Sequence, residues 1–158
     1  MNKKLKKIIF PALILIAVCT ACSGLQYLPS APYTKVIWKN WGIALPSEGA
    51  RDLYAYSVPS PHGDGVRYHV IDYEIDNASK RVEAAVSQLD AFFNDAPQPT
   101  EDQVLYVEQL LAGTGIEDEE LPDWKSCRLV YQKSNDNSEI FLFFWSGTGT
   151  LYVVESFL

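Results

Sequence analysis

The spacing of hydrophobic and polar positions predicts strands at both ends of a domain and helices between them. Runs rich in β-branched and aromatic residues, apolar at alternate positions or throughout, are typical of strands. Six such runs are present, at 35–45, 53–58, 66–75, 127–132, 140–145 and 150–157. Pro46 and Pro59 close the first two runs, and Gly42 is expected to mark a bulge in the first. The run 140–145 is apolar at every position, so we expect it inside the sheet with both faces covered.

Between the third and fourth runs the apolar spacing becomes helical. One apolar stripe at i, i+3, i+4, i+7 and i+11 is formed by Val82, Ala85, Val86, Leu89 and Phe93. Asp76 or Asn77 is the expected cap of this helix. A second helix is predicted after Thr100, because Thr100 and Gln103 have the spacing of a capping box. Gly113 is its expected C-terminal stop.

The resulting order is βββ-αα-βββ, which predicts the fold class. Runs of strands that flank a helix pair are typical of an α+β domain, here with a mainly antiparallel sheet and two helices packed on one face. Ser146–Gly149 is short and contains glycine, so we expect a hairpin turn between the last two strands. Residues 34–158 are therefore predicted to form a single α+β domain.

The first 22 residues do not fit this domain. Four lysines between positions 3 and 7 precede an apolar run, Ile8–Val18, and small residues then lead to Cys22. These are the parts of a secretory signal. The arrangement resembles the signal of bacterial lipoproteins, in which the cysteine after the cleavage site receives lipid; Cys19 stands where that family usually has leucine. The resemblance implies a signal peptide at 1–21, lipidation of Cys22 and a lipidated tether at 22–33.

Two other interpretations of this segment stay open. A retained spanning helix needs about 20 apolar residues, and the run has only 11. Cleavage without lipidation would release a secreted protein. If Cys22 carries lipid, the segment Ser23–Tyr33 reaches at most ~36 Å at about 3.3 Å per residue. A partner is then expected close to the membrane. If the host has an outer membrane, Ser23 after the lipid site resembles the pattern of lipoproteins sent onward to that membrane.

The charge balance narrows the classes of partner. The chain has 13 Lys+Arg and 20 Asp+Glu, and removal of the signal takes away four lysines and no acid, which leaves a formal charge of −11. Such a domain is repelled by phosphate backbones and anionic headgroups, so we expect no nucleic-acid partner. Beyond Cys19 and Cys22 only Cys127 remains, so no internal disulfide is expected, and Cys127 is predicted to be a small buried side chain.

The histidines offer one candidate for metal chemistry. His62, Asp64 and His69 provide two imidazoles and a carboxylate, the ligand types of an open zinc site. Their spacing matches no established motif, and His62–Gly65 also has the composition of a turn. Phosphate-binding glycine loops, H-E-x-x-H and G-x-S-x-G are absent from the sequence, so no cofactor and no catalytic residue is predicted.

Aromatic residues offer a second candidate. Trp38, Trp41, Tyr54 and Tyr56 are concentrated in the N-terminal half. Such rings stack on sugars or on partner side chains, or they fill the core and pair across strands. The four residues are the candidate ligand-binding positions.

The sequence therefore favours a membrane-anchored bacterial lipoprotein that acts as a non-enzymatic binding module at the cell envelope. Its expected partner is a membrane-proximal protein or a cell-wall component. Two alternatives remain: an inhibitor or immunity-type protein, which the acidic composition fits, and a metal-dependent hydrolase that uses His62, Asp64 and His69.

Overall fold

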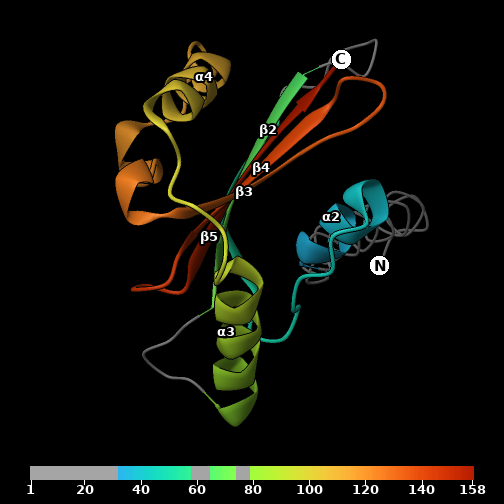
Figure 1. Ribbon diagram of the computed structural model, residues 1–158, viewed down its shortest axis with the longest axis vertical. Coiled ribbons are helices and arrows are strands. Elements are labelled where there is room, and N and C mark those ends of the chain that lie inside the picture. The colour runs from blue at the N-terminus through green and yellow to red at the C-terminus, as the bar shows by residue number, and fades with distance from the viewer. Residues whose placement is uncertain (1–31, 58–64, 74–78) are drawn as a thin grey trace, which may run out of the picture. The chain divides into compact units, whose positions relative to one another are not determined.

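The computed structural model describes residues 32–57, 65–73 and 79–158, and Pro32–Leu158 form one compact unit (Figure 1). The predicted signal peptide, Cys22, the candidate caps Asp76 and Asn77, and the metal candidates His62 and Asp64 lie outside the described residues. Within the described part, no helix combines the length and the hydrophobicity needed to cross a bilayer.

The described strands form one antiparallel sheet. Its members are β1 (Arg51–Ser57), β2 (Gly65–Asp72), β3 (Arg128–Lys133), β4 (Glu139–Trp145) and β5 (Thr150–Phe157). They are arranged in the order β1-β2-β5-β4-β3, and every pair of neighbours is antiparallel. The predicted α+β class with an antiparallel sheet is therefore confirmed, as is the hairpin turn between β4 and β5.

The first predicted strand, 35–45, is wrong. Thr34–Trp41 form helix α2, so two strands rather than three precede the helix pair. Gly42 ends α2 in the left-handed conformation with φ +69°, and its N–H donates to the carbonyl of Trp38 at 2.9 Å. Tyr33, Ile37 and Trp41 recur every four residues and are buried together in the core. Burial of this stripe against the sheet outweighs the weak strand preference of β-branched and aromatic residues.

The two later helices lie on opposite faces of the sheet, which corrects the prediction that both pack on one face. Helix α3 (Lys80–Phe93) shares a core with α2, whereas α4 (Glu101–Leu111) and the short 3-10 turn Trp124–Ser126 belong to a second core (Figure 1). The reason lies in β4, whose apolar side chains point to both faces, so each face requires a cover.

The connection between α3 and α4 crosses the sheet edge at β3. The N–H of Leu129 donates to the carbonyl of Pro97 at 2.9 Å, and the Arg128 guanidinium donates to the carbonyl of Phe93 at 3.0 Å. These bonds hold the chain at the edge while it passes from one face to the other. They also satisfy edge groups that would otherwise be open.

The predicted starts and stops of α4 are confirmed. The Thr100 hydroxyl accepts from the Gln103 N–H at 3.3 Å, and the Gln103 side chain accepts from the Thr100 N–H at 2.9 Å. Gly113 follows the helix with φ +81°. The buried face of α3 is formed by Ala85, Leu89 and Phe93, as the helical stripe predicts.

Candidate functional site

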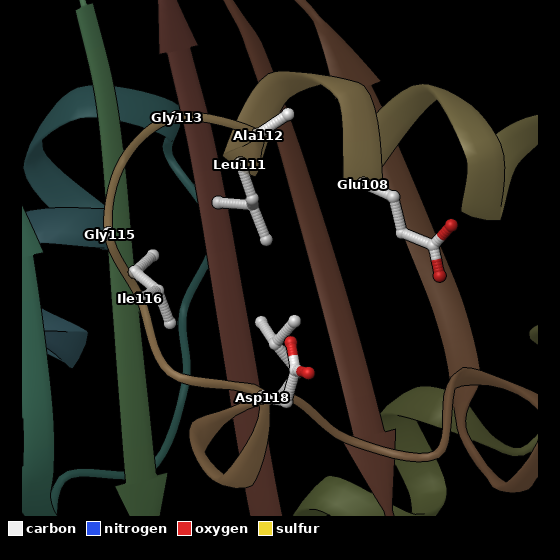
Figure 2. Close-up of a pocket in the computed structure, with 8 residues that line it drawn as sticks. Glu108, Leu111, Ala112, Gly113, Gly115, Ile116 and Asp118 are labelled. Carbon is white, nitrogen blue, oxygen red and sulfur yellow. The ribbon is translucent and has the colours of Figure 1, made fainter.

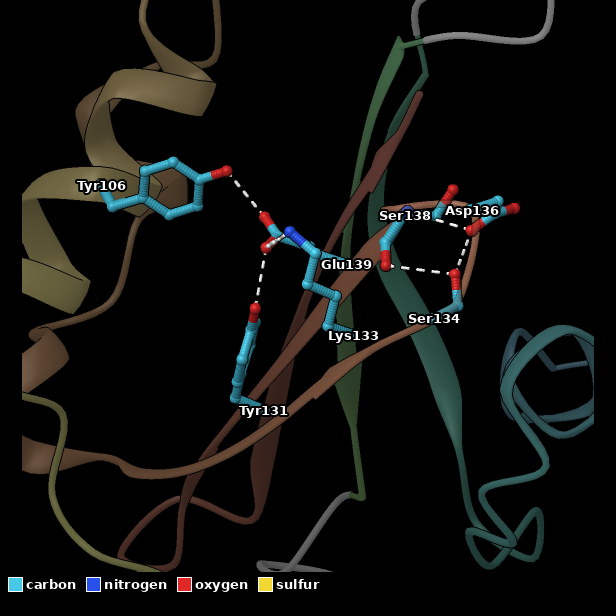
Figure 3. A network of polar contacts seen from close by, with 7 residues as sticks. All are labelled: Tyr106, Tyr131, Lys133, Ser134, Asp136, Ser138 and Glu139. Atoms are coloured by element: carbon cyan, nitrogen blue, oxygen red, sulfur yellow. Dashed lines mark hydrogen bonds and ion pairs between the residues drawn. The ribbon is translucent and has the colours of Figure 1, made fainter.

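A carboxylate at the start of β4 organises the most developed polar site in the described chain. Glu139 is buried, and its Oε2 accepts from the Tyr106 hydroxyl at 2.6 Å. Its Oε1 accepts from the Tyr131 hydroxyl at 2.7 Å and lies 3.3 Å from the Lys133 Nζ. Figure 3 shows the two phenols approaching Glu139 from different elements, Tyr106 from α4 and Tyr131 from β3.

Strand register positions these groups. Lys133 is the cross-strand partner of Glu139, and Tyr131 is the cross-strand partner of Phe141. The Phe141 ring centroid is 4.8 Å from that of Tyr131 and 5.8 Å from that of Tyr106. Packing of Val107 and Leu111 on the same sheet face fixes α4, and thereby brings Tyr106 over the strands.

The hydrogen bonds set the protonation states. Burial raises the pKa of Glu139, but the bonds donated by Tyr106, Tyr131 and Lys133 outweigh it, so the net pKa lies below its ordinary value. Burial and the bond to Glu139 raise the pKa of Tyr131 to about 12. The pKa of Tyr106 is raised mainly by its hydrogen bond to Glu139. At neutral pH the site therefore holds one ionised carboxylate and two protonated phenols.

These aromatic rings line a shallow open pocket of about 220 Å³, which we call the tyrosine pocket. It is lined by Asp102, Gln103, Tyr106, Tyr131 and Phe141. Although their hydroxyls are fixed, Tyr106 and Tyr131 are 41% and 43% exposed, so their rings are available to a ligand. Aromatic walls with a few oriented polar groups are typical of binding sites.

A second pocket, of about 500 Å³, lies at the C-terminal end of α4 (Figure 2). Leu111 and Ile116 give it apolar walls, while Glu108 and Asp118 contribute carboxylates from the helix and the following loop. It shares α4 with the tyrosine pocket but lacks aromatic side chains and any polar network like that of Glu139. We therefore place the candidate site at the tyrosine pocket.

The other sheet face carries a buried cluster that is structural in character. Glu155 is fully buried and accepts hydrogen bonds from the Tyr33 hydroxyl and the Trp41 indole N–H. His69 stacks on Tyr33 with ring centroids 3.3 Å apart. Burial, reinforced by the nearby Arg67 charge, lowers the pKa of His69 to about 4. The cluster fastens α2 to the sheet and is closed to solvent at Glu155.

The aromatic candidates from the sequence are not brought together. Trp38 is 63% exposed on α2, while Trp41 is buried against Glu155. Tyr54 and Tyr56 are half-buried on β1 and belong to the core under α4, on the other face of the sheet. The four residues therefore do not form one platform.

The metal candidates are only partly described. His69 is buried under Tyr33 on the α2 side, and His62 and Asp64 lie outside the described residues. In the part of the chain that the structure describes, no three His, Cys, Asp or Glu side chains are grouped so that they could hold a metal ion.

Sequence reasoning missed Tyr106, Tyr131 and Glu139. Tyr106 is 33 positions from Glu139 in the sequence, and the two meet only because α4 packs on the sheet. The available signals were a single acid, Glu139, at the head of an apolar strand and a single tyrosine, Tyr131, in the strand before it. No known family, no curated protein and no solved structure matches this chain.

Proposed function

We propose that this protein is an exported, lipid-anchored binding module of a bacterial envelope membrane, and that it contacts its ligand through the tyrosine pocket. The lipoprotein-like signal supports the anchor at Cys22. The arrangement of Tyr106 and Tyr131 around Glu139 is the observation that carries the binding function.

The geometry favours binding because the pocket is ordered before any ligand arrives. Both phenols are held by one carboxylate, so the rings lose little conformational freedom when a ligand contacts them. Tyrosine supplies large contact area at low entropic cost and is enriched at interaction sites. The pKa values of both phenols are raised, so the hydroxyls stay protonated at neutral pH, which supports binding over nucleophilic catalysis.

The anchor supports a partner near the bilayer. Tyr33, the last residue of the predicted tether, is buried in the domain. The tether before the compact unit is then Ser23–Ala31, which spans at most ~30 Å at about 3.3 Å per residue. If the bound partner is a toxin or an enzyme, the binding module acts as an inhibitor or immunity-type protein.

Site-specific photo-crosslinking in intact cells tests the proposal. A photoreactive residue at Leu105, which is 54% exposed beside the pocket on α4, is compared with one at Trp38, exposed on α2 across the sheet. We expect capture of a defined species from Leu105 and not from Trp38, identified by mass spectrometry. We also expect Cys22→Ser to release the protein from the membrane fraction and to abolish capture.

Two results would contradict the proposal. Capture from Trp38 alone would place the binding surface on the α2 side of the domain. If Cys22→Ser remains in the membrane fraction to the same extent as the native protein, lipid on Cys22 is not what anchors it.

A further inference from the structure

We propose that the tyrosine pocket receives a lysine or arginine side chain from a basic protein partner that docks along the acidic face of α4. This inference rests on the proposed binding function and identifies the chemistry of the partner. It follows from the walls of the pocket, from the polar groups behind them and from the distribution of charge around α4.

The walls suit a cation. Tyr106, Tyr131 and Phe141 present three rings to one small pocket, and aromatic faces carry negative electrostatic potential that attracts ammonium and guanidinium groups. Both phenols donate to a carboxylate, and this bond shifts electron density toward the rings. The same pocket contains the carboxylate of Asp102, which forms no ion pair with any described residue.

The charge on α4 and on the loop that follows it is of one sign. From Thr100 to Trp124 the chain has eight Asp and Glu and not one Lys or Arg. None of these acids forms an ion pair with a described residue. On α4 itself, Glu101, Asp102 and Glu108 are exposed. A surface of this kind steers a basic partner toward itself and repels an acidic one.

The basic residue beside Glu139 is already engaged. Lys133 lies 3.3 Å from Glu139 and is 47% exposed. It offsets the charge of Glu139 but is not among the residues that line the pocket, so Asp102 and the rings stay open to an incoming cation. The structure therefore favours a cationic side chain over a neutral sugar, which could accept no charge attraction from the surrounding acids and would gain only hydrogen bonds.

Binding of defined probes to the full chain in neutral detergent tests the inference. The first probe is an unstructured peptide of alternating lysine and serine, the second is the same peptide with glutamine for lysine, and the third is an uncharged N-acetylglucosamine oligosaccharide. Affinity is measured by NMR titration at two salt concentrations. We expect binding of the lysine peptide alone, weakened by added salt as screening predicts.

Substitutions locate the binding. Tyr131→Ala and Asp102→Asn are each expected to weaken binding of the lysine peptide about two- to fivefold, the range for one exposed cation–π contact and for one favourable exposed ion pair. Asp90→Asn on α3 makes the same charge change away from the pocket and is expected to leave affinity unchanged. Tyr131→Phe retains the ring but not the bond to Glu139, and is expected to fall between the native protein and Tyr131→Ala.

Each alternative outcome overturns the inference. Asp90→Asn and Asp102→Asn could lower the affinity for the lysine peptide equally while Tyr131→Ala leaves it unchanged. That result would mean that the peptide binds by net charge without entering the pocket. Binding of the oligosaccharide alone, lost in Tyr131→Ala, means a glycan ligand and leaves the proposed function standing. If no probe changes the resonances of Tyr106 and Tyr131, the inference of a cationic ligand is wrong. The proposed function is decided separately, by crosslinking from Leu105.

Discussion

The phenol of Tyr33 donates a hydrogen bond to the carboxylate of Glu155, 122 positions further along the chain. Trp41 donates to the other oxygen of the same carboxylate from one end of α2, while Tyr33 lies just before the other end. One buried acid on β5 thus fixes both ends of the helix that follows the predicted membrane tether. The stability of the domain and the attachment of its anchored end therefore depend on the same group.

Tyr33→Phe tests this attachment. The substitution keeps the ring stacked on His69 but leaves one oxygen of a buried carboxylate without its donor. We expect the free energy of unfolding to fall by about 1–3 kcal/mol, the usual cost of an unsatisfied buried polar group. Urea denaturation followed by circular dichroism measures it.

The matched control is Tyr56→Phe. The Tyr56 hydroxyl makes no hydrogen bond to any described residue, so this variant should stay within about 0.5 kcal/mol of the native protein. A loss in Tyr33→Phe no greater than in Tyr56→Phe would mean that the bond to Glu155 does not hold α2.

Thr100→Ala tests the start of α4. The alanine removes the oxygen that accepts from the Gln103 N–H and so breaks the capping box. We expect a loss of about 1 kcal/mol in the free energy of unfolding. Ser87→Ala is the comparison, because the Ser87 hydroxyl bonds only the carbonyl of Glu83 within α3 and is exposed. If the two variants unfold at the same urea concentration, the cap contributes nothing measurable.

His69 should make stability depend on pH between its unfolded and folded pKa values. Burial lowers the folded pKa to about 4 from an ordinary value of 6.5, with Arg67 adding to the effect. The Tyr33 ring stacks on it, and Arg67 is the charged group that acts on it. Between pH 6.5 and about 4, His69 binds a proton in the unfolded chain but not in the folded chain. The contribution of neutral His69 to the free energy of unfolding is therefore complete above pH 6.5. It is lost as the pH falls toward 4, by up to about 1.4 kcal/mol per pH unit.

Urea denaturation at pH 7, 6 and 5 measures this slope. His69→Phe retains an aromatic ring against Tyr33 and should reduce the slope, whereas His62→Gln, at the only other histidine, should preserve it. If His62→Gln loses the slope and His69→Phe keeps it, the titrating group is His62 and the prediction for His69 is wrong.

Cys127 should be inert in the folded protein. It is fully buried, and burial together with Asp123 raises the pKa of the thiol to about 12. In a chain with Cys19→Ser and Cys22→Ser, Cys127 is the sole thiol. A thiol reagent at pH 8 should label it on the order of a hundredfold more slowly than in urea. Rapid labelling without urea would show that the core beside Asp123 opens.

How far the sequence predicts this protein depends on the range of the interactions involved. The capping box at Thr100 and Gln103, the stripe of α3 and the turn Ser146–Gly149 each join residues a few positions apart. Local spacing contains all the information that these features require, so their prediction is confirmed. The acidic stretch around α4 likewise follows from the sequence alone.

Tertiary structure decided the rest. Thr34–Trp41 became a helix because Glu155 and the sheet bury one side of it, and α3 and α4 separated because β4 is apolar on both faces. The tyrosine pocket exists because α4 packs over β3 and β4 and brings Tyr106 to Glu139. Each outcome depends on residues that meet only after the chain folds, and local spacing does not encode which distant groups will meet.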